Sequence, residues 1–174
     1  MVSGYDIKDA GRERKNIHTA VSVRIARAGD VGYIRSLSRT AFHEYGPYEE
    51  MLPNWFTSGI TVTLLALIED RPVGFAMIRR LGRESRLHRV SELLAIAVEP
   101  SQRKRGIGDL LLREIQTTAQ RTGVESLVLH TAINNLPGRT LFKKHGFILL
   151  DTKRRFYPRG QDAVMMYKEV QRVS

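Results

Sequence analysis

The sequence contains no cysteine among its 174 residues. This absence excludes disulfide bonds, thiolate metal sites and cysteine nucleophiles, and it fits a reducing compartment. No apolar run is long enough to span a bilayer, and no apolar signal core stands near the N-terminus, so we expect a cytoplasmic protein without a membrane partner. The five histidines show no metal-ligand spacing, and no metal is expected.

Three motifs of familiar enzyme classes are also missing. The chain has no G-x-x-x-x-G-K-[ST] phosphate loop and no G-x-S-x-G nucleophile elbow. Gly106-Ile107-Gly108 is not followed by the third glycine of a dinucleotide-binding fingerprint. These absences argue against P-loop nucleotide hydrolysis, dinucleotide binding and serine-elbow catalysis.

Composition predicts one globular domain. Hydrophobic residues make up 42% of the chain and charged residues 26%. Residues 1–20 are polar and without periodicity, so we expect a flexible basic leader followed by a domain over 21–174. The net charge is +10, but the basic stretches contain few stacking aromatics. The charge therefore indicates solubility and an anionic cofactor, and nucleic acid is not expected as a partner.

The stretch from Ser91 to Thr122 predicts a strand, a donor-rich loop and a helix. Leu93–Val98 is an unbroken apolar run, typical of a strand covered on both faces, and Pro100 ends it. The loop 103–108 carries three cations and two glycines, and apolar residues then recur at helical spacing. This helix start is a candidate phosphate site. The N–H groups of the first turn have no partner within the helix, the helix dipole is positive at that end, and glycine lets a phosphate come close to the backbone. Basic residues at a solvated turn are the alternative.

The remaining periodicity predicts a mixed α/β sheet of element order βααβββαβαββ. The expected boundaries are a strand at 21–25, a helix from 31 capped by Asp30, a second helix through 51–56, strands at 61–69 and 72–80 joined at Asp70-Arg71, the central strand and helix, a strand at 124–131 after the helix stop Gly123, a short helix closed by Gly146, and strands at 148–156 and 163–170. The aromatic and acidic segment 43–56 is either a wall for a cationic substrate or core packing beside a solvated turn.

The central motif resembles a known family. R-x-x-G-x-G after a strand ending in Ile-Ala-Val-Glu-Pro closely resembles the acetyl-CoA pyrophosphate loop of the GNAT acyl-CoA N-acyltransferase superfamily, and the resemblance extends over about residues 21–170. It implies a GNAT-like domain whose sheet is split between the fourth and fifth strands, with acetyl-CoA as co-substrate. The cofactor contacts that it implies are backbone groups of Ile96, Ala97 and Val98, the loop residues Arg103, Lys104, Arg105, Gly106, Ile107 and Gly108, and Asn135, Arg139 and Phe142.

Two residues are candidates for the base that deprotonates the amine. Glu92 precedes the apolar run and falls where the histone-acetylating branch of the superfamily carries its glutamate; partial desolvation there would raise its pKa. His130 alternates with Leu129 on the next strand and resembles the histidine of one branch of protein N-terminal acetyltransferases. An exposed strand-end carboxylate and a structural histidine are the alternatives.

The main departure from the family is at Phe142. Most GNAT members carry a tyrosine there, whose hydroxyl protonates the leaving thiolate, and a phenyl ring has no such proton. Either CoA leaves as the thiolate, or another group such as Tyr157 substitutes, or the protein is not an efficient transferase. Tyr157-Pro158 resembles the tyrosine-proline turn of N-terminal acetyltransferases.

The resemblance therefore predicts an N-acetyltransferase that acts by direct attack in a ternary complex. A peptide or protein amine is favoured as acceptor, with a small-molecule amine as the alternative. An acyl-CoA-binding sensor with little turnover is a second alternative, because of Phe142. The sequence is compatible with a homodimer.

Overall fold

A computed structural model of the chain describes residues 20–81 and 89–170. Residues 1–19 of the predicted leader, and most of the predicted basic connection between 81 and 90, lie outside the described residues. No helix in these two ranges is both long and apolar enough to cross a membrane.

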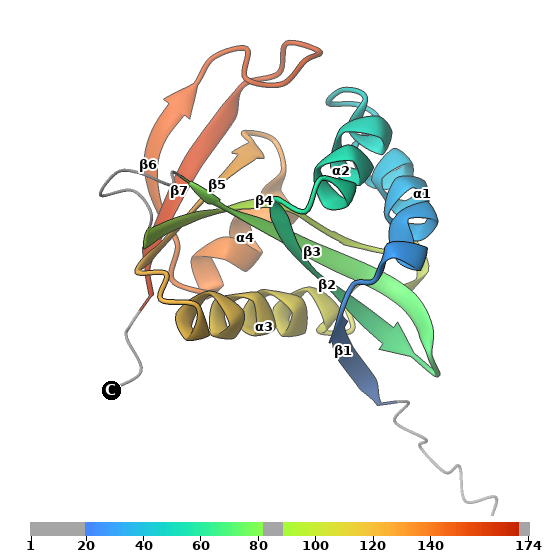
Figure 1. Cartoon of the computed structure of the whole chain (residues 1–174). Coiled ribbons are helices and arrows are strands. Elements are labelled where there is room, and N and C mark those ends of the chain that lie inside the picture. Colours follow the sequence, from blue (N-terminus) through green and yellow to red (C-terminus); the bar gives the residue numbers. More distant parts are fainter. Residues whose placement is uncertain (1–19, 82–88, 171–174) are drawn as a thin grey trace, which may run out of the picture.

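The element order matches the prediction, βααβββαβαββ (Figure 1). The elements are β1 Val21–Ile25, α1 Val31–Phe42, α2 Tyr48–Thr57, β2 Thr61–Ile68, β3 Arg71–Leu81, β4 Val90–Val98, α3 Ile107–Arg121, β5 Ser126–Ala132, α4 Leu136–Lys144, β6 Ile148–Lys153 and β7 Ala163–Glu169, with short 3-10 turns η1 at Ala28–Asp30 and η3 at Pro100–Gln102. Gly123 ends α3 with a φ of 76°, as predicted.

The seven strands of the described residues form one mixed sheet in the order β1-β2-β3-β4-β5-β7-β6. Only β4 and β5 are parallel, and they pair over four residues, from Val90 opposite Ser126 to Leu93 opposite Leu129. Beyond Leu93, β4 continues along β3 alone while β5 continues along β7. The predicted split between the fourth and fifth strands is therefore confirmed, and it leaves one edge of β4 open.

A β-bulge at Leu94 coincides with the start of the split. Ile78 pairs with Leu93 and Met77 with Ala95, so Leu94 is the extra residue on β4. A bulge changes which face of the sheet the following side chains reach. Leu93 accordingly packs in the core on the α3 side, whereas Ala95 packs in the core on the α1–α2 side.

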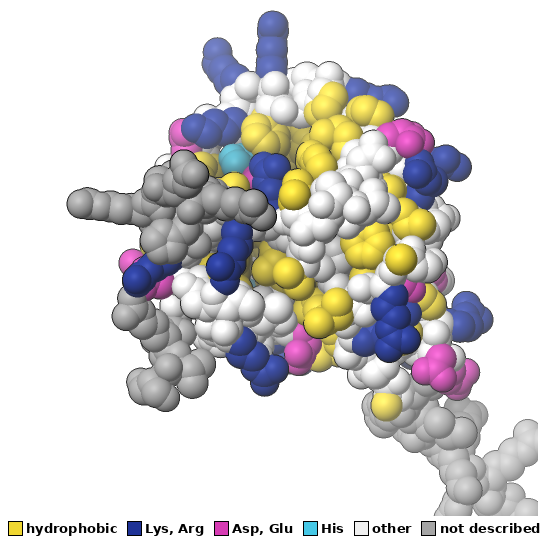
Figure 2. Space-filling view, viewed as in Figure 1, with side chains coloured by type: hydrophobic (Ala, Val, Ile, Leu, Met, Phe, Trp, Pro, Cys, Tyr) yellow, Lys and Arg dark blue, Asp and Glu magenta, His cyan; other side chains and the backbone are white. Residues whose placement is uncertain are grey.

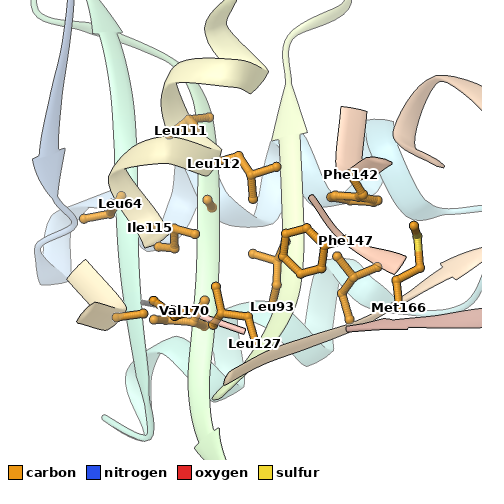
Figure 3. Close-up of a cluster of buried hydrophobic side chains, with 14 of the residues drawn as sticks. Leu64, Leu93, Leu111, Leu112, Ile115, Leu127, Phe142, Phe147, Met166 and Val170 are labelled. Atoms are coloured by element: carbon orange, nitrogen blue, oxygen red, sulfur yellow. The ribbon is translucent and has the colours of Figure 1, made fainter. Parts of the chain in front are cut away.

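The helices cover both faces of the sheet (Figure 1). The α3 side holds the larger core, where Leu111, Leu112 and Ile115 meet Leu93 and Phe147 (Figure 3). The α1–α2 side holds a second core around Leu52 and Phe75. Apolar cover on both faces explains why β4 has the continuous apolar sequence of a buried strand.

Three local predictions need correction. Asp30 stands at the N-cap position of α1 but its side chain makes no capping hydrogen bond there; its carboxylate accepts a hydrogen bond from the backbone N–H of Arg27 at 2.6 Å and pairs with Arg24 at 2.7 Å. The β2–β3 turn lies at Glu69-Asp70, one residue earlier than predicted, because both residues take left-handed φ values. The central strand begins at Val90, so Glu92 lies inside it.

Candidate active site

A cavity of about 290 Å³ lies at the split in the sheet. Its walls come from α1, α2 and the connection between them, from β3, from both strands of the split, from α4 with the residue before it, and from the turn between β6 and β7. The lining residues are Phe42, Tyr45, Tyr48, Met51, Trp55, Arg79, Glu92–Ile96, His130–Ala132, Asn135, Phe142 and Phe156–Pro158. Figure 2 shows hydrophobic side chains between the β6–β7 hairpin and α2, with Lys and Arg side chains on both sides.

The β6–β7 turn closes one side of the cavity against the α1–α2 connection. The backbone N–H of Arg159 donates to the carbonyl of Tyr45 at 3.2 Å. The rings of Tyr45 and Tyr157 lie 4.8 Å apart, centroid to centroid. A side chain at Gly46 would come within 2.8 Å of Cγ of Pro158, so only glycine allows this approach.

Glu92 and His130 meet in the cavity although they stand on different strands. Oε1 of Glu92 lies 3.2 Å from Nδ1 of His130, and the two side chains are 13% and 15% exposed. The parallel register brings them together, because Glu92 pairs opposite Val128, two residues from His130 and on the same face. His130 faces the cavity while Leu129 enters the core, as the alternation predicted.

The expectation that desolvation raises the pKa of Glu92 is wrong. Burial does raise the pKa, but hydrogen bonds from His130 and from Arg79 together outweigh burial and lower it. Nε and Nη2 of Arg79 both donate to Oε2, at 3.2 and 2.9 Å. Glu92 is therefore ionised at neutral pH, and an acid held in its ionised form is a weak proton acceptor.

His130 is left as the stronger candidate for the base. When Nδ1 carries the ring hydrogen, it donates to Glu92, and Nε2 keeps a lone pair. Among the described residues, Nε2 has no hydrogen-bond partner. The ring stacks on Phe156 at 4.3 Å with an interplanar angle of 15°, which fixes its plane.

The Tyr157 side chain lines the same cavity. Burial raises the pKa of its hydroxyl, and the neighbouring Tyr48 and Tyr45 raise it further. The phenol therefore keeps its proton through the physiological range and can act as a donor.

The predicted phosphate loop leads directly into α3. Lys104 and Gly106 have left-handed φ values of 59° and 77°, and Gly106 is the N-cap. Nothing lies within 4 Å of the position a Gly106 Cβ would take. Ile107 is buried in the core, so only its backbone N–H can face an anion. Of the cations, Nε of Arg103 donates to the Val98 carbonyl at 3.1 Å.

The family model for the acetyltransferase (GNAT) family matches residues 31–147. The chain belongs to this family. It is an N-acetyltransferase with the GNAT fold. Members of this family use acetyl-CoA. The match spans α1 through Phe147 and so includes both strands of the split.

Three proteins illustrate the similarity. An N-alpha-acetyltransferase of Sulfurisphaera tokodaii is 28% identical over 153 residues, covering 83% of this chain and 90% of that protein. The ribosomal-protein-S18-alanine N-acetyltransferase of Escherichia coli has a TM-score of 0.74 at 19% identity, covering 89% and 97% of the two chains. The Salmonella typhimurium protein yncA, solved with its cofactor acetyl-CoA, has a TM-score of 0.75 at 17% identity, covering 89% and 96%.

The other predicted cofactor residues of this GNAT domain lie around the cavity or near it. Ile96 lines the cavity, whereas Ala97 and Val98 continue along the open edge of β4. Asn135 caps α4: its Oδ1 accepts from the Gly138 N–H at 3.1 Å, and its Nδ2 donates to Thr131 at 3.0 Å. One lone pair and one N–H of this amide remain available.

Arg139 and Phe142, both on α4, differ in how closely they approach the cavity. Nη1 of Arg139 donates to the carbonyl of Ile133 at 2.7 Å, and this residue is not part of the cavity wall. Phe142 is 5% exposed, packs edge-to-face on Phe147 at 6.0 Å and forms part of the cavity wall.

Sequence reasoning missed Arg79 and Phe156 as site residues. The available signal for Arg79 was its place directly after the apolar run 73–78 of β3, but only strand pairing shows that it faces Glu92. Of the segment predicted either as a substrate wall or as core packing, Tyr45, Tyr48 and Trp55 line the cavity. Its acidic residues do not line the cavity; Glu50, for example, pairs with Arg35 at 2.6 Å.

Proposed function

We propose that this chain transfers an acetyl group from acetyl-CoA to a primary amine, with a peptide or protein amine favoured over a small molecule. The observation that carries the proposal is the Glu92–His130 pair inside the cavity at the split. An alkylammonium has a reference pKa of ~10.4 and no lone pair, so a nearby base must take a proton before the amine attacks. In this proposal His130 is that base, and Glu92 orients it.

The described residues fit an acetyl-CoA laid along the open edge of β4. Backbone groups of 96–98 have no ladder partner on that edge, and the cationic loop 103–108 meets the first turn of α3 beyond it. Main-chain amides at a helix start bind phosphate well. We assign the diphosphate to this loop and the pantetheine arm to 96–98 with Asn135 and Phe142 beside it; Arg139 assists from outside the wall. Bound acetyl-CoA supplies the activated acetyl thioester.

The aromatic side of the cavity supports a peptide acceptor. Tyr45, Tyr48 and Tyr157 converge from two segments distant in sequence, with Tyr48 and Tyr157 at 6.2 Å between centroids. Such rings combine apolar contact with hydroxyls that bond to a backbone. The hydroxyl of Tyr157, whose pKa is raised, is our candidate for protonating the departing thiolate in place of a tyrosine at 142.

The test is thiol release from acetyl-CoA in the presence of defined amines. We expect release with peptides that have a free N-terminal amine, and none with the same peptides acetylated at the N-terminus. A small polyamine serves as the comparison for the small-molecule alternative. If neither free peptides nor small amines give thiol release, the proposal is refuted.

Phe142 favours a second candidate, an acyl-CoA sensor with little turnover. Because Phe142 has no hydroxyl, the leaving group lacks the donor that most members of the family supply. Titration of acetyl-CoA alone distinguishes the two functions. Tight binding without transfer to any amine in the same panel would support the sensor.

The contact between Gly46 and Pro158 of the β6–β7 turn allows the binding of the acceptor amine to be tested separately from the binding of acetyl-CoA. Gly46→Ala would bring a Cβ within 2.8 Å of Pro158 and displace the tip of the β6–β7 turn. Because a 1 Å misplacement of a positioning group can cost ~100-fold in rate, we expect kcat/KM for the acceptor to fall at least ~10-fold. The affinity for acetyl-CoA should stay unchanged in calorimetric titration.

Gly59→Ala is the matched control for this variant. Gly59 also has a left-handed φ, of 73°, but nothing lies within 4 Å of its Cβ position. It should lose stability without losing acceptor activity. Equal losses of activity in both variants would contradict an acceptor site beneath the hairpin.

Three expectations from the sequence stay predictions. They are a cytoplasmic location, compatibility with a homodimer, and the absence of a nucleic-acid partner.

A further inference from the structure

Arg79 occupies a place in the cavity that the sequence did not assign to it. It lies opposite Glu92 in the antiparallel β3–β4 register, and its guanidinium stands over the ring of Trp55, 5.6 Å from the centroid. A cation over an indole face is stabilised by the ring. The guanidinium is therefore held between α2 and β4, at one end of the Arg79–Glu92–His130 series.

The contact between Arg79 and Glu92 is one-sided. Both donors of Arg79 reach Oε2, at 3.2 and 2.9 Å, whereas Oε1 faces Nδ1 of His130 at 3.2 Å. The common fork arrangement, with one donor to each oxygen, would take Oε1 away from the histidine. The guanidinium thus sets the rotation of the carboxylate so that one oxygen remains for the ring.

The charge of Arg79 has a second consequence. A carboxylate next to an imidazole favours the protonated ring, and a protonated ring cannot accept a proton. Among the described residues, the other titratable side chains on this cavity wall are Tyr45 from the α1–α2 connection, Tyr48 from α2 and Tyr157 from the β6–β7 turn. All three are neutral phenols whose pKa values are raised, first by burial. Among the described lining residues, Arg79 is the cation that offsets the charge of Glu92.

Stability alone is a weak explanation for this ion pair. The side chain of Arg79 is 35% exposed and that of Glu92 13%. Ion pairs in such half-buried positions contribute little net stability, because desolvation offsets the attraction. Fixing the geometry and the charge of the catalytic pair is the better account.

We propose that Arg79 is a positioning residue of the acetyl transfer, which acts through Glu92 to aim Oε1 at His130 and to offset the negative charge that Glu92 places beside the imidazole. This inference rests on the proposed function, in which His130 is the base.

The test is the pH dependence of kcat/KM for Arg79→Met. With the cation removed, the charge of Glu92 is no longer offset, so the ring stays protonated to higher pH. The acidic limb of the profile, where kcat/KM falls as the pH is lowered, should therefore move to higher pH by about one unit. Arg79→Lys keeps the charge with one donor group, and should leave the acidic limb in place while lowering the plateau rate. If Arg79→Met does not fold, Arg79→Gln is uncharged and carries the same expectation.

Arg80→Met is the matched control. Arg80 follows on the same strand but points to the other face, where its guanidinium donates to the carbonyl of Thr122. This variant should keep the wild-type profile. An unmoved acidic limb in Arg79→Met, or an equal shift in Arg80→Met, would overturn the inference.

His130→Gln separates failure of the inference from failure of the proposed function. If His130→Gln keeps the wild-type rate, the proposed base is wrong and the inference falls with it. If His130→Gln is inactive and Arg79→Met keeps the wild-type acidic limb, only the role of Arg79 is wrong.

Discussion

His130→Gln is expected to lower kcat/KM for acetyl transfer by about 10²- to 10⁴-fold, the range typical of removing a general base. Glutamine keeps a polar side chain of similar size but has no basic nitrogen. The affinity for acetyl-CoA should be retained, because the proposed role of His130 is toward the amine. The measurements are steady-state thiol release and calorimetric titration with acetyl-CoA.

Glu92→Gln should lower kcat/KM for acetyl transfer nearly as much as His130→Gln does, and the reason is geometric. Arg79 donates to Oε2, so the amide oxygen of the glutamine should take that place and turn its NH₂ toward Nδ1 of His130. A donor at Nδ1 favours the tautomer with hydrogen on Nε2, which then cannot accept a proton.

The matched control for both variants is His43→Gln. His43 is exposed at the end of α1 and does not line the cavity. It should keep the wild-type rate. A His130→Gln protein as active as His43→Gln would exclude His130 as the base and would return attention to Tyr157 or to solvent.

The second large effect is expected at the phosphate loop. Gly106→Glu should weaken acetyl-CoA binding by about 100-fold or more, because a carboxylate beside a diphosphate costs several kcal/mol. The left-handed φ of 77° at Gly106 adds about 1–2 kcal/mol of backbone strain for any other residue. Gly108 is a less selective choice, since its Cβ would meet Leu141 at 3.4 Å.

Gly123→Glu separates backbone strain from the charge effect. Gly123 stands at the other end of α3 with a φ of 76°, and nothing lies within 4 Å of its Cβ position. Both variants should lose similar stability in thermal unfolding, and only Gly106→Glu should lose binding in calorimetry. Wild-type affinity in Gly106→Glu would refute the assignment of the diphosphate to this loop.

Local sequence patterns predicted the elements well because each pattern reflects one local preference. The apolar run 93–98 required a buried strand, and the repeat of Leu111, Ile115 and Ala119 required a helix with one buried face. Glycines with left-handed φ at 106 and 123 mark the two ends of that helix. The errors were small shifts, such as the β2–β3 turn, where propensity does not fix the register.

The candidate site was predictable in its parts but not in its contacts. Glu92 and His130 were both candidates, yet their roles as rival bases changed once they proved to share a hydrogen bond. The direction of the pKa shift of Glu92 was wrong because desolvation was considered without Arg79, a partner 13 residues away in sequence. Phe156 gave no signal, since its stacking on His130 depends on how the β6–β7 turn folds over.

The sequence by itself determined the family, the order of the elements and the cationic loop that opens α3, because these depend on residues adjacent in the chain. The tertiary structure alone decided which charges meet. A four-residue parallel pairing, ended by the bulge at Leu94, opens the sheet and leaves Glu92 and His130 on one wall of the cavity. The antiparallel register of β3 then adds Arg79. Ionisation depends on distances of a few ångströms between strands, and such distances are fixed only when the chain is packed.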